Sequence, residues 1–277
     1  KRLGKRDQTL MEVLAQMAAL ILEPEVLEQE RCQQIESRLL PLMDAGGPVV
    51  VVQPIVDLAT GARAGAEALS RFPAEWGLAP DICFAQAHSV GLGHELELLA
   101  LQRAAEHLDE IGGYVAMNVS PATLLLPQTI DAVAALPVER VLLELSEHDP
   151  VDDYDELGEA LEPLRHRGLR LAIDDVGAGF SSLRHIVLAR PDVIKLDRSI
   201  VHGLADDPVL STLVRSLVEF GHAAGATVVA EGIEDAREAD AARRLGVDHG
   251  QGWHFGRPGP ARDLAPAAGS TVPAARG

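Results

Sequence analysis

After residue 47 the sequence alternates between short apolar runs and longer segments with helical periodicity, and this alternation allows few architectures. The apolar runs lie at residues 48–56, 62–69, 114–120, 141–147, 169–175, 192–197, 227–233 and 250–255. Helical patterns lie between several of them, at residues 95–108, 153–168, 209–225 and 235–246. Eight strand candidates, most of them followed by a helix candidate, predict an α/β protein with a (β/α)8 barrel.

The first two apolar runs depart from this regular pattern. The connection between them, DLATG at residues 57–61, is too short for a crossover helix, so the two strands are expected to pair antiparallel. We therefore predict a TIM-like barrel with an antiparallel first strand. Barrels of this kind commonly reach about 250 residues as one domain, so a single barrel can account for residues 47–264.

The segments on either side of the barrel have different textures. Apolar residues recur every three or four positions from Leu10 to Leu22, and a second helical pattern runs from Glu25 to Met43. Pro24 is expected to end the first helix before the second begins. We predict an N-terminal helical linker over residues 1–46, of the kind that carries signals between domains; packing of these helices against the outside of the barrel is an equal alternative. Residues 265–277 lack periodicity, which predicts a disordered tail.

The charge and cysteine content exclude some classes of protein. The chain has 42 Asp and Glu against 24 Lys and Arg, a formal charge of -18, which argues against a binder of duplex nucleic acid because such a protein needs a basic face. Cys32 and Cys83 are far apart and form no disulfide framework, so a cytoplasmic location is expected. No apolar run approaches the length of a membrane span, so we expect no membrane contact in this segment.

Polar residues stand at the expected carboxyl ends of the strands, where (β/α)8 barrels carry their active sites. Each residue alone has an ordinary explanation as a turn former or a surface group. A closed barrel, however, would bring all of them to one rim. They are Glu67, Asn118, Glu144, Asp174, Asp175, Lys195, Asp197, Glu231 and Gln251.

Such a rim needs positive charge. Two carboxylates 4 Å apart repel by about 4 kcal/mol at an effective dielectric constant near 20, and Lys195 alone cannot offset several of them. Divalent cations can, and oxygen donors from Asp, Glu and Asn favour Mg²⁺ or Mn²⁺ over zinc. The adjacent pair Asp174 and Asp175 suggests two ions, one of them reached by both acids.

The segment GAEALSRF, residues 65–72, places an acid and a base on one face of a predicted strand. If the ligand is an anion, Glu67 can hold a metal ion while Arg71 donates charge-assisted hydrogen bonds to a phosphate. An ion pair between Glu67 and Arg71 is the weaker interpretation, because same-face residues four apart in a strand lie roughly 13 Å from each other.

Eight motifs between about Val49 and Pro258 share their order with a known family. They are QPIVD, EALSRF, NVSP, ELSE, IDDVGAGFSSL, PDVIKLDRS, VAEGIE and QGWHFGRP. Together they resemble the EAL-domain phosphodiesterases, which hydrolyse the bacterial messenger cyclic di-GMP. The resemblance implies a (β/α)8 barrel whose first strand is antiparallel. It also implies attack of water on one phosphodiester bond, with linear pGpG as the product.

The resemblance also implies a role for each site residue. One metal ion would be held by Glu67, Asn118, Glu144 and Asp174, and Asp174 would bridge to a second ion held by Asp175 and Glu231. Lys195 resembles the family lysine beside the attacking water, Asp197 its orienting partner, and Gln251 a glutamine near that water. Gln53 resembles a guanine contact, Leu69 and Arg71 resemble substrate contacts, and Glu147 resembles a glutamate that stabilises the loop after Asp175. Either Lys195 or a carboxylate such as Glu231 could accept the proton of the water.

The loop after the fifth strand departs from the family pattern. It reads DDVGAGFSSL in place of DDFGTGYSSL, so that Val176, Ala178 and Phe180 replace an aromatic ring, a hydroxyl and a phenol. Both acids remain, so metal binding is expected, whereas turnover and regulation are harder to predict. A non-catalytic cyclic di-GMP receptor is the alternative function, although no expected metal ligand is missing. A scaffold would leave the acidic rim unexplained.

The remaining expectations concern partners and other residues. The helices before residue 47 resemble the linker that follows a sensory domain in many family members, so we expect an upstream input domain and a homodimer. The histidines show no pairing four residues apart on a helix and are interpreted as surface or packing groups. Trp76 and Trp253 are interpreted as packing residues, with Trp253 in the last strand.

Overall fold

In the computed structural model, which describes residues 5–146, 151–177 and 182–264, eight strands close into a barrel in chain order. The strands are β1 (Val49–Asp57), β2 (Arg63–Arg71), β3 (Tyr114–Asn118), β4 (Val141–Ser146), β5 (Arg170–Val176), β6 (Val193–Leu196), β7 (Thr227–Ala230) and β8 (His249–Gln251). β1 is antiparallel to both of its neighbours, β2 and β8, and every other neighbouring pair is parallel. The predicted barrel and its antiparallel first strand are confirmed.

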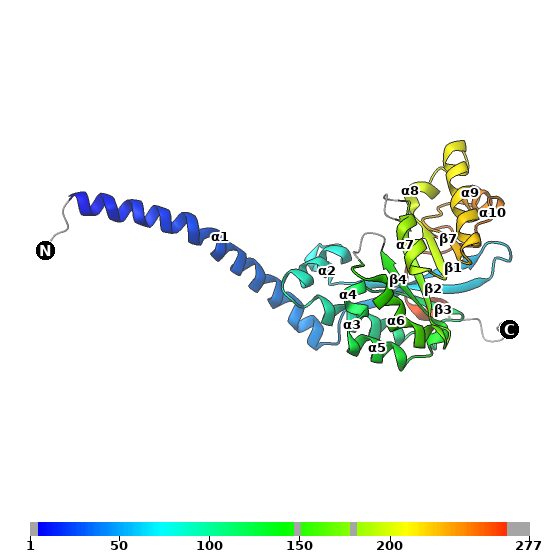
Figure 1. Ribbon diagram of the computed structural model, residues 1–277, viewed down its shortest axis with the longest axis horizontal. Helices are drawn as coiled ribbons and strands as arrows, with labels where there is room; N and C mark the ends of the chain where they lie inside the picture. The colour runs from blue at the N-terminus through cyan, green and yellow to red at the C-terminus, as the bar shows by residue number, and fades with distance from the viewer. Residues whose placement is uncertain (1–4, 147–150, 178–181, 265–277) are drawn as a thin grey trace.

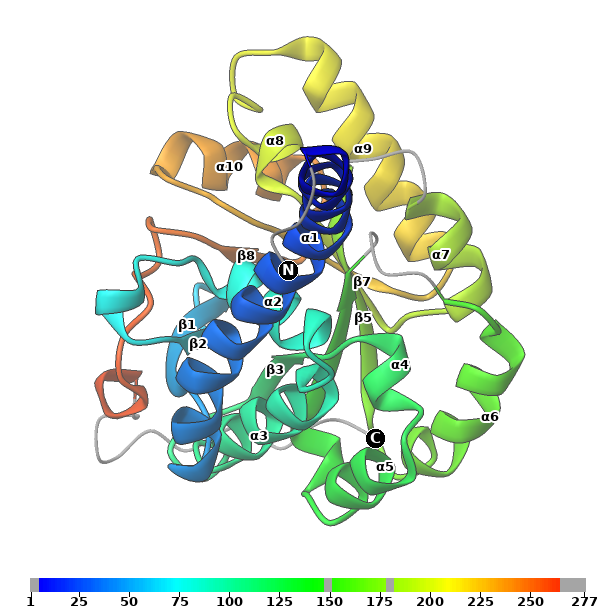
Figure 2. The same cartoon turned by 90° about the vertical axis from the view of Figure 1, so that its left-hand side faces the viewer.

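Helices cover the outside of the barrel (Figure 2). In chain order they are α1 (Lys5–Asp44), α2 (Pro80–Ser89), α3 (Gly93–Ala105), α4 (Pro121–Leu124), α5 (Pro127–Ala134), α6 (Tyr154–Arg165), α7 (Ser182–Ala189), α8 (Arg198–Val201), α9 (Pro208–Ala223) and α10 (Ala236–Arg244). Four of them begin at an aspartate whose side chain accepts a hydrogen bond from the first turn: Asp153, Asp197, Asp207 and Asp235. These caps satisfy amide groups that have no partner within the helix, which fixes where each helix starts.

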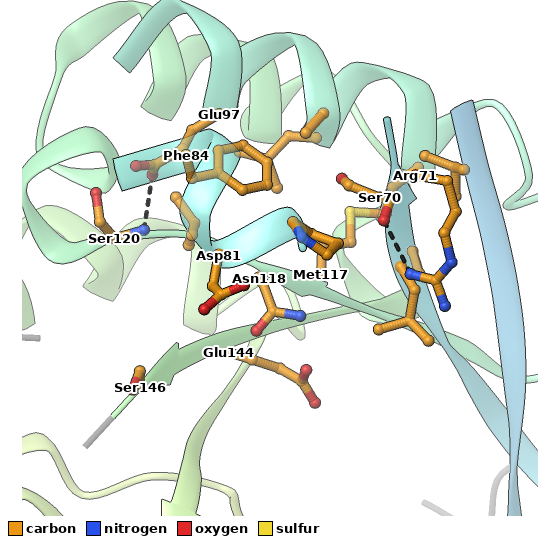
Figure 3. Close-up of a pocket in the computed structure, with 18 of the residues that line it drawn as sticks. Ser70, Arg71, Asp81, Phe84, Glu97, Met117, Asn118, Ser120, Glu144 and Ser146 are labelled. Carbon is orange, nitrogen blue, oxygen red and sulfur yellow. Dashed lines mark hydrogen bonds between the residues drawn. The ribbon is translucent and has the colours of Figure 1, made fainter. Parts of the chain in front are cut away.

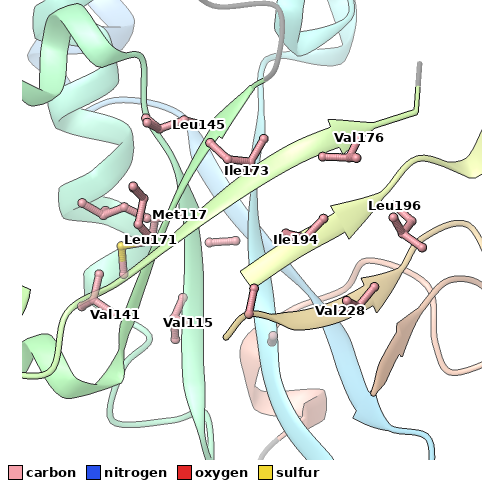
Figure 4. Close-up of a cluster of buried hydrophobic side chains, with 14 of the residues drawn as sticks. Val115, Met117, Val141, Leu145, Leu171, Ile173, Val176, Ile194, Leu196 and Val228 are labelled. Carbon is pink, nitrogen blue, oxygen red and sulfur yellow. The ribbon is translucent and has the colours of Figure 1, made fainter. Parts of the chain in front are cut away.

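The alternation of side chains along the strands sorts the barrel into two apolar clusters and one polar layer. One face of the strands packs against the helices, as with Val115, Ile173 and Val228 (Figure 4). The other face fills the barrel interior with Ile55, Tyr114, Ala116, Leu142, Ala172, Val193 and Val229. Two residues further toward the carboxyl end, the same face of β3 to β6 carries Asn118, Glu144, Asp174 and Lys195. The interior therefore changes from apolar to charged along its axis.

The N-terminal segment is one helix, not two. α1 spans 40 residues and continues through Pro24, where the sequence predicted an interruption. A proline inside a helix removes one backbone hydrogen bond, but the Leu- and Glu-rich sequence on both sides favours helix formation. The last turns of α1 dock on the barrel domain through Ile35 and Leu39, which pack with Ala87 of α2 and Leu96 of α3. The earlier part extends away from the barrel (Figure 1).

The chain leaves the barrel earlier than expected after β8. A Cβ atom at Gly252 would lie 2.1 Å from the backbone oxygen of Ile233, so this close approach requires glycine, and the strand stops at Gln251. Trp253 lies in the following turn with 55% of its surface exposed and stacks on the guanidinium of Arg257, so its placement in a packed strand was wrong. Trp76 packs beside Phe72 as expected.

Some expectations fall outside this description. Glu147, Ala178, Phe180 and the predicted tail at residues 265–277 lie outside the residues that the structure describes. Within the described ranges, none of the helices combines the length and the apolar character that a membrane span requires.

Candidate active site

Lys195 of β6 lies at the centre of the polar layer. Its side chain is 1% exposed, and its Nζ atom lies 2.7 Å from Glu231 Oε1, 3.0 Å from Glu144 Oε1, 3.1 Å from Asp174 Oδ2 and 3.8 Å from Glu67 Oε2. The four acids come from β2, β4, β5 and the residue that follows β7. Closure of the barrel therefore brings residues from distant parts of the sequence around one ammonium group.

The same acids form two groups that could each hold a metal ion. Glu67, Glu144 and Asp174 offer oxygen atoms that all lie within 4.8 Å of one another, and so do Asp174, Asp175 and Glu231. Asp174 belongs to both groups. Both carboxylate oxygens of Glu144 are buried and accept no hydrogen bond. The Lys195 ammonium is close enough to Oε1 for an ion pair, but it is not oriented to donate a hydrogen bond to it. Buried oxygens with free lone pairs fit a hard divalent cation such as Mg²⁺ or Mn²⁺.

Burial makes this concentration of charge costly. Burial raises the pKa of Glu144 well above its ordinary value and that of Asp174 to a smaller degree. Burial, together with the nearby Asp174, raises the pKa of Glu231 to about 8. For Lys195 burial alone would lower the pKa, but the surrounding carboxylates outweigh it, so the pKa rises well above its ordinary value. Four acids around one ammonium thus need further positive charge to stay ionised together.

Two amide side chains hold Glu67 in place, and a third contacts one of them. Asn118 Nδ2 donates to Glu67 Oε1 at 3.1 Å, and Gln251 Nε2 donates to Glu67 Oε2 at 2.5 Å. Gln251 Nε2 also lies 3.2 Å from Gln53 Oε1, and Gln53 Nε2 donates to the carbonyl of Gly256 at 3.0 Å. These contacts bring Gln53, Asn118 and Gln251 together with the acids, and they fix both oxygens of Glu67.

The strand β5 ends in an unusual backbone conformation. Asp175 has φ of 59°, in the left-handed region that residues other than glycine seldom adopt. The pairing of β5 with β6 changes register between Ile173 and Val176. A regular strand would direct two consecutive side chains to opposite faces. The irregularity instead lets both Asp174 and Asp175 belong to one group of ligands, at a cost of order 1–3 kcal/mol.

The other expected residues lie around this centre. Asp197 directly follows β6 and caps α8, where its carboxylate accepts a hydrogen bond from the amide of Ser199 at 2.8 Å. Leu69 and Arg71 line a cavity of about 470 Å³ together with Asn118 and Glu144. Figure 3 shows Arg71, Asn118 and Glu144 in its lining. The cavity therefore lies directly beside the group of acids.

The far wall of this cavity was not anticipated from the sequence. It comes from α2 and α3 and includes Phe84, His88 and Glu97, with Ser120 at its edge. Glu97 is only 7% exposed. The sequence could have indicated that Glu97 is buried. The α3 residues that face the barrel are spaced three and four apart, and position 97 is one of them. An acid on such a stripe indicates a specific polar partner.

The chain is similar in sequence to known proteins over most of its length. The model of the EAL domain family matches residues 36–258. The probable cyclic di-GMP phosphodiesterase PdeD of Escherichia coli (strain K12) is 30% identical over 236 residues, 81% of this chain and 44% of PdeD. PdeB of the same organism, also named a probable cyclic di-GMP phosphodiesterase, is 29% identical over 247 residues, 84% of this chain and 47% of PdeB. The chain thus spans less than half of each of these relatives.

Solved structures are similar over most of the chain. The PaMucR phosphodiesterase in complex with cyclic di-GMP is 28% identical with a TM-score of 0.73, over 83% of this chain and 99% of that one. BlrP1 of Klebsiella pneumoniae, in complex with manganese and cyclic di-GMP, is 31% identical with a TM-score of 0.68, over 76% of this chain and 56% of BlrP1. On the family match, the motifs and the barrel, this chain belongs to the EAL domain family.

Proposed function

We propose that this chain is a metal-dependent phosphodiesterase that hydrolyses cyclic di-GMP to linear pGpG. The observation that carries the proposal is the pair of oxygen-donor groups that share Asp174, next to a cavity lined by Leu69 and Arg71. The names of PdeD and PdeB, and the cyclic di-GMP bound by PaMucR and BlrP1, support this substrate.

The acids and Asn118 would hold two divalent cations, Mg²⁺ or Mn²⁺. One set of ligands is Glu67, Asn118, Glu144 and Asp174, and the other is Asp174, Asp175 and Glu231. When bound, such ions supply positive charge at the phosphoryl oxygens and lower the pKa of a water molecule. The manganese in the BlrP1 complex supports this assignment.

The protein's own groups would handle the substrate and its protons. Lys195, whose pKa is raised, stays protonated at neutral pH and serves as a positive charge beside the phosphate rather than as a base. Glu231 Oε1 lies 2.7 Å from Lys195 Nζ, and of the two candidate bases Glu231 is the better one, because an ionised carboxylate can accept a proton whereas a protonated ammonium cannot. Asp197 would fix the segment after Lys195 by capping α8.

The remaining residues would bind and orient the substrate and the attacking water. Gln251 would hold Glu67 and lie near the attacking water, Gln53 would contact a guanine base, and Leu69 and Arg71 would contact the dinucleotide. Arg71 is suited to a phosphate because its guanidinium offers several donors in one plane. Glu147 would stabilise the loop after Asp175.

The test is incubation of the purified chain with cyclic di-GMP and either MgCl₂ or MnCl₂, followed by chromatography for pGpG. We expect product with the parent chain and none with Glu67→Ala or Lys195→Ala. A matched control is Glu28→Ala, which removes an exposed acid of α1 far from the site. Tight binding of cyclic di-GMP without product would favour the receptor function, and unchanged turnover in the Glu67 and Lys195 variants would overturn the assigned site.

We further propose that α1 connects the barrel to an upstream sensory domain and that the chain acts as a homodimer in the cytoplasm. The extension of α1 beyond the barrel supports a connecting role. Light scattering during size-exclusion chromatography tests the dimer, since a monomer mass at micromolar concentration would contradict it.

A further inference from the structure

We propose that Glu97 of α3 is a positioning residue that holds the β3–α4 loop, and with it Asn118, in place for metal binding. The proposal rests on the proposed function only in taking Asn118 as a metal ligand. Nothing in the motifs of the sequence singles out Glu97. Its assignment comes from its contacts and from its place in the wall of the cavity beside the site.

Both carboxylate oxygens of Glu97 have partners on other elements. Oε2 accepts a hydrogen bond from the backbone amide of Ser120 at 2.8 Å, as Figure 3 shows. Oε1 lies 2.5 Å from Nε2 of His88 on α2. A buried carboxylate is costly unless such partners satisfy it, so this residue has a specific task in the folded chain.

The contact between Glu97 and Ser120 matters because Ser120 lies two residues after Asn118 in the same loop. Asn118 is the last residue of β3 and is exposed, so packing does not fix its side chain. Its amide is held by the hydrogen bond to Glu67, and the backbone that follows sets where this side chain starts. Val119 donates from its amide to the carbonyl of Glu144 at 3.1 Å, and Ser120 donates to Glu97. These two bonds hold the loop against the neighbouring strand on one side and against α3 on the other.

A wider network holds Glu97 itself. The His88 ring packs edge to face on His94, with 5.4 Å between ring centroids. His94 Nδ1 lies 2.7 Å from Thr123 Oγ1, and the Ser120 hydroxyl lies 3.0 Å from the same oxygen. The contacts return to Ser120, so α2, α3 and the first turn of α4 are joined behind the loop that carries Asn118.

A carboxylate that only stabilises the fold could also pair with a backbone amide and a histidine, but it would lie away from the candidate site. The chain contains such a carboxylate. Asp248 Oδ2 accepts a hydrogen bond from the amide of Val228 at 2.8 Å and lies 2.8 Å from Nε2 of His222. Asp248 directly precedes β8 and therefore lies at the amino-terminal end of that parallel strand, opposite the candidate site. It is a matched control, although it is more exposed than Glu97.

The experiment uses the full chain and its Glu97→Ala, Glu97→Gln, His88→Ala and Asp248→Ala variants. Mn²⁺ binding is measured by electron paramagnetic resonance of the free ion, and thermal unfolding is followed in parallel. We expect Glu97→Ala to bind Mn²⁺ about 10-fold more weakly, as is typical when a residue that orients a ligand is removed. Glu97→Gln should retain most of the affinity because its amide oxygen can still accept from Ser120. His88→Ala should lose less affinity than Glu97→Ala.

The control separates positioning from stability. Asp248→Ala should unfold at a lower temperature and bind Mn²⁺ as the parent does. Unchanged Mn²⁺ affinity in Glu97→Ala, or an equal loss in Asp248→Ala, would overturn the positioning role. If Glu97→Ala does not fold, an unchanged affinity in His88→Ala overturns it and a reduced one supports it. A parent that binds Mn²⁺ but forms no pGpG would overturn the proposed function alone, while a parent that binds no Mn²⁺ would overturn both proposals.

Discussion

Asp174 and Asp175 are consecutive residues, and the amide of Asp175 donates a 2.9 Å hydrogen bond to Oδ1 of Asp174. This contact accompanies the left-handed backbone of Asp175 and the register change between β5 and β6. The local distortion is what allows two neighbouring acids to serve one group of ligands. Strain held at this position is thus tied to the proposed chemistry, because an extended strand could present only one of the two acids.

The first prediction separates the carboxylate of Asp175 from its backbone conformation. Asparagine adopts the left-handed region more readily than most residues, so Asp175→Asn should keep the stability of the parent. Asp175→Ala should lose about 1 kcal/mol of unfolding free energy, because alanine has no local hydrogen bond to offset the strain. Both variants should lose phosphodiesterase activity. Urea unfolding and pGpG formation measure the two effects, and an active Asp175→Asn would remove this acid from the ligand set.

The second prediction concerns pH and metal removal. The folded-state pKa of Glu231, about 8, lies above its ordinary value of 4.5, and the pKa of Glu144 is raised as well. An acid whose pKa is higher in the folded state contributes stability that is complete below the unfolded pKa and is lost as pH rises through the folded pKa. The unfolding free energy of the chain in EDTA should therefore fall between about pH 4.5 and pH 8, by at most about 1.4 kcal/mol per pH unit for each such group.

Divalent cations should reverse this loss. Mg²⁺ or Mn²⁺ supplies the positive charge that ionised acids need, and a ligand that binds only the folded state stabilises it. Urea unfolding at pH 5, 6, 7 and 8, with EDTA and with MgCl₂, measures the effect. Stability in EDTA that rises toward pH 8 would contradict the electrostatic description of the site.

The third prediction concerns Arg71 in the cavity beside the acids. Arg71→Ala should raise KM for cyclic di-GMP by about 10- to 100-fold, the range expected for the loss of a hydrogen bond to a charged group. Arg71→Lys should recover only part of this loss, because an ammonium cannot reproduce the planar array of donors. Mn²⁺ binding should stay unchanged in both variants. Steady-state kinetics measure KM, and weaker metal binding would instead place Arg71 among the residues that support the ions.

The sequence predicted the barrel and its polar rim because both depend on local patterns. Strands such as β4 and β5 appear as short apolar runs, and the acids that end them, Glu144 and Asp174, stand where parallel strands share an edge. Features set by tertiary contacts were missed. Gly252 ends β8 because the chain passes close to Ile233, which places Trp253 in an exposed turn. No local pattern contains that contact.

Pro24 shows a different limit, and Glu97 shows the same one. A proline inside a helical pattern is an ordinary stop signal, and only the sum of helix-forming residues on both sides of Pro24 decides that α1 continues. The pairing of Glu97 with Ser120 joins residues 23 positions apart. The buried stripe of α3 indicates that Glu97 needs a partner, but the partner becomes visible only when β3 and α3 are packed together.

The last prediction tests how α1 is attached to the barrel domain. Leu39 is 2% exposed and packs against α2 and α3, whereas its neighbour Leu40 is 46% exposed. Leu39→Ala should destabilise the docked end of α1 by about 2–3 kcal/mol, because it removes buried apolar contacts and leaves a cavity. Leu40→Ala is the matched control and should change stability by less than about 0.5 kcal/mol. Hydrogen exchange should show faster exchange of α1 amides near residue 39 in the first variant, with β3 to β6 protected as in the parent. Equal effects of the two substitutions would mean that α1 is not held by this contact.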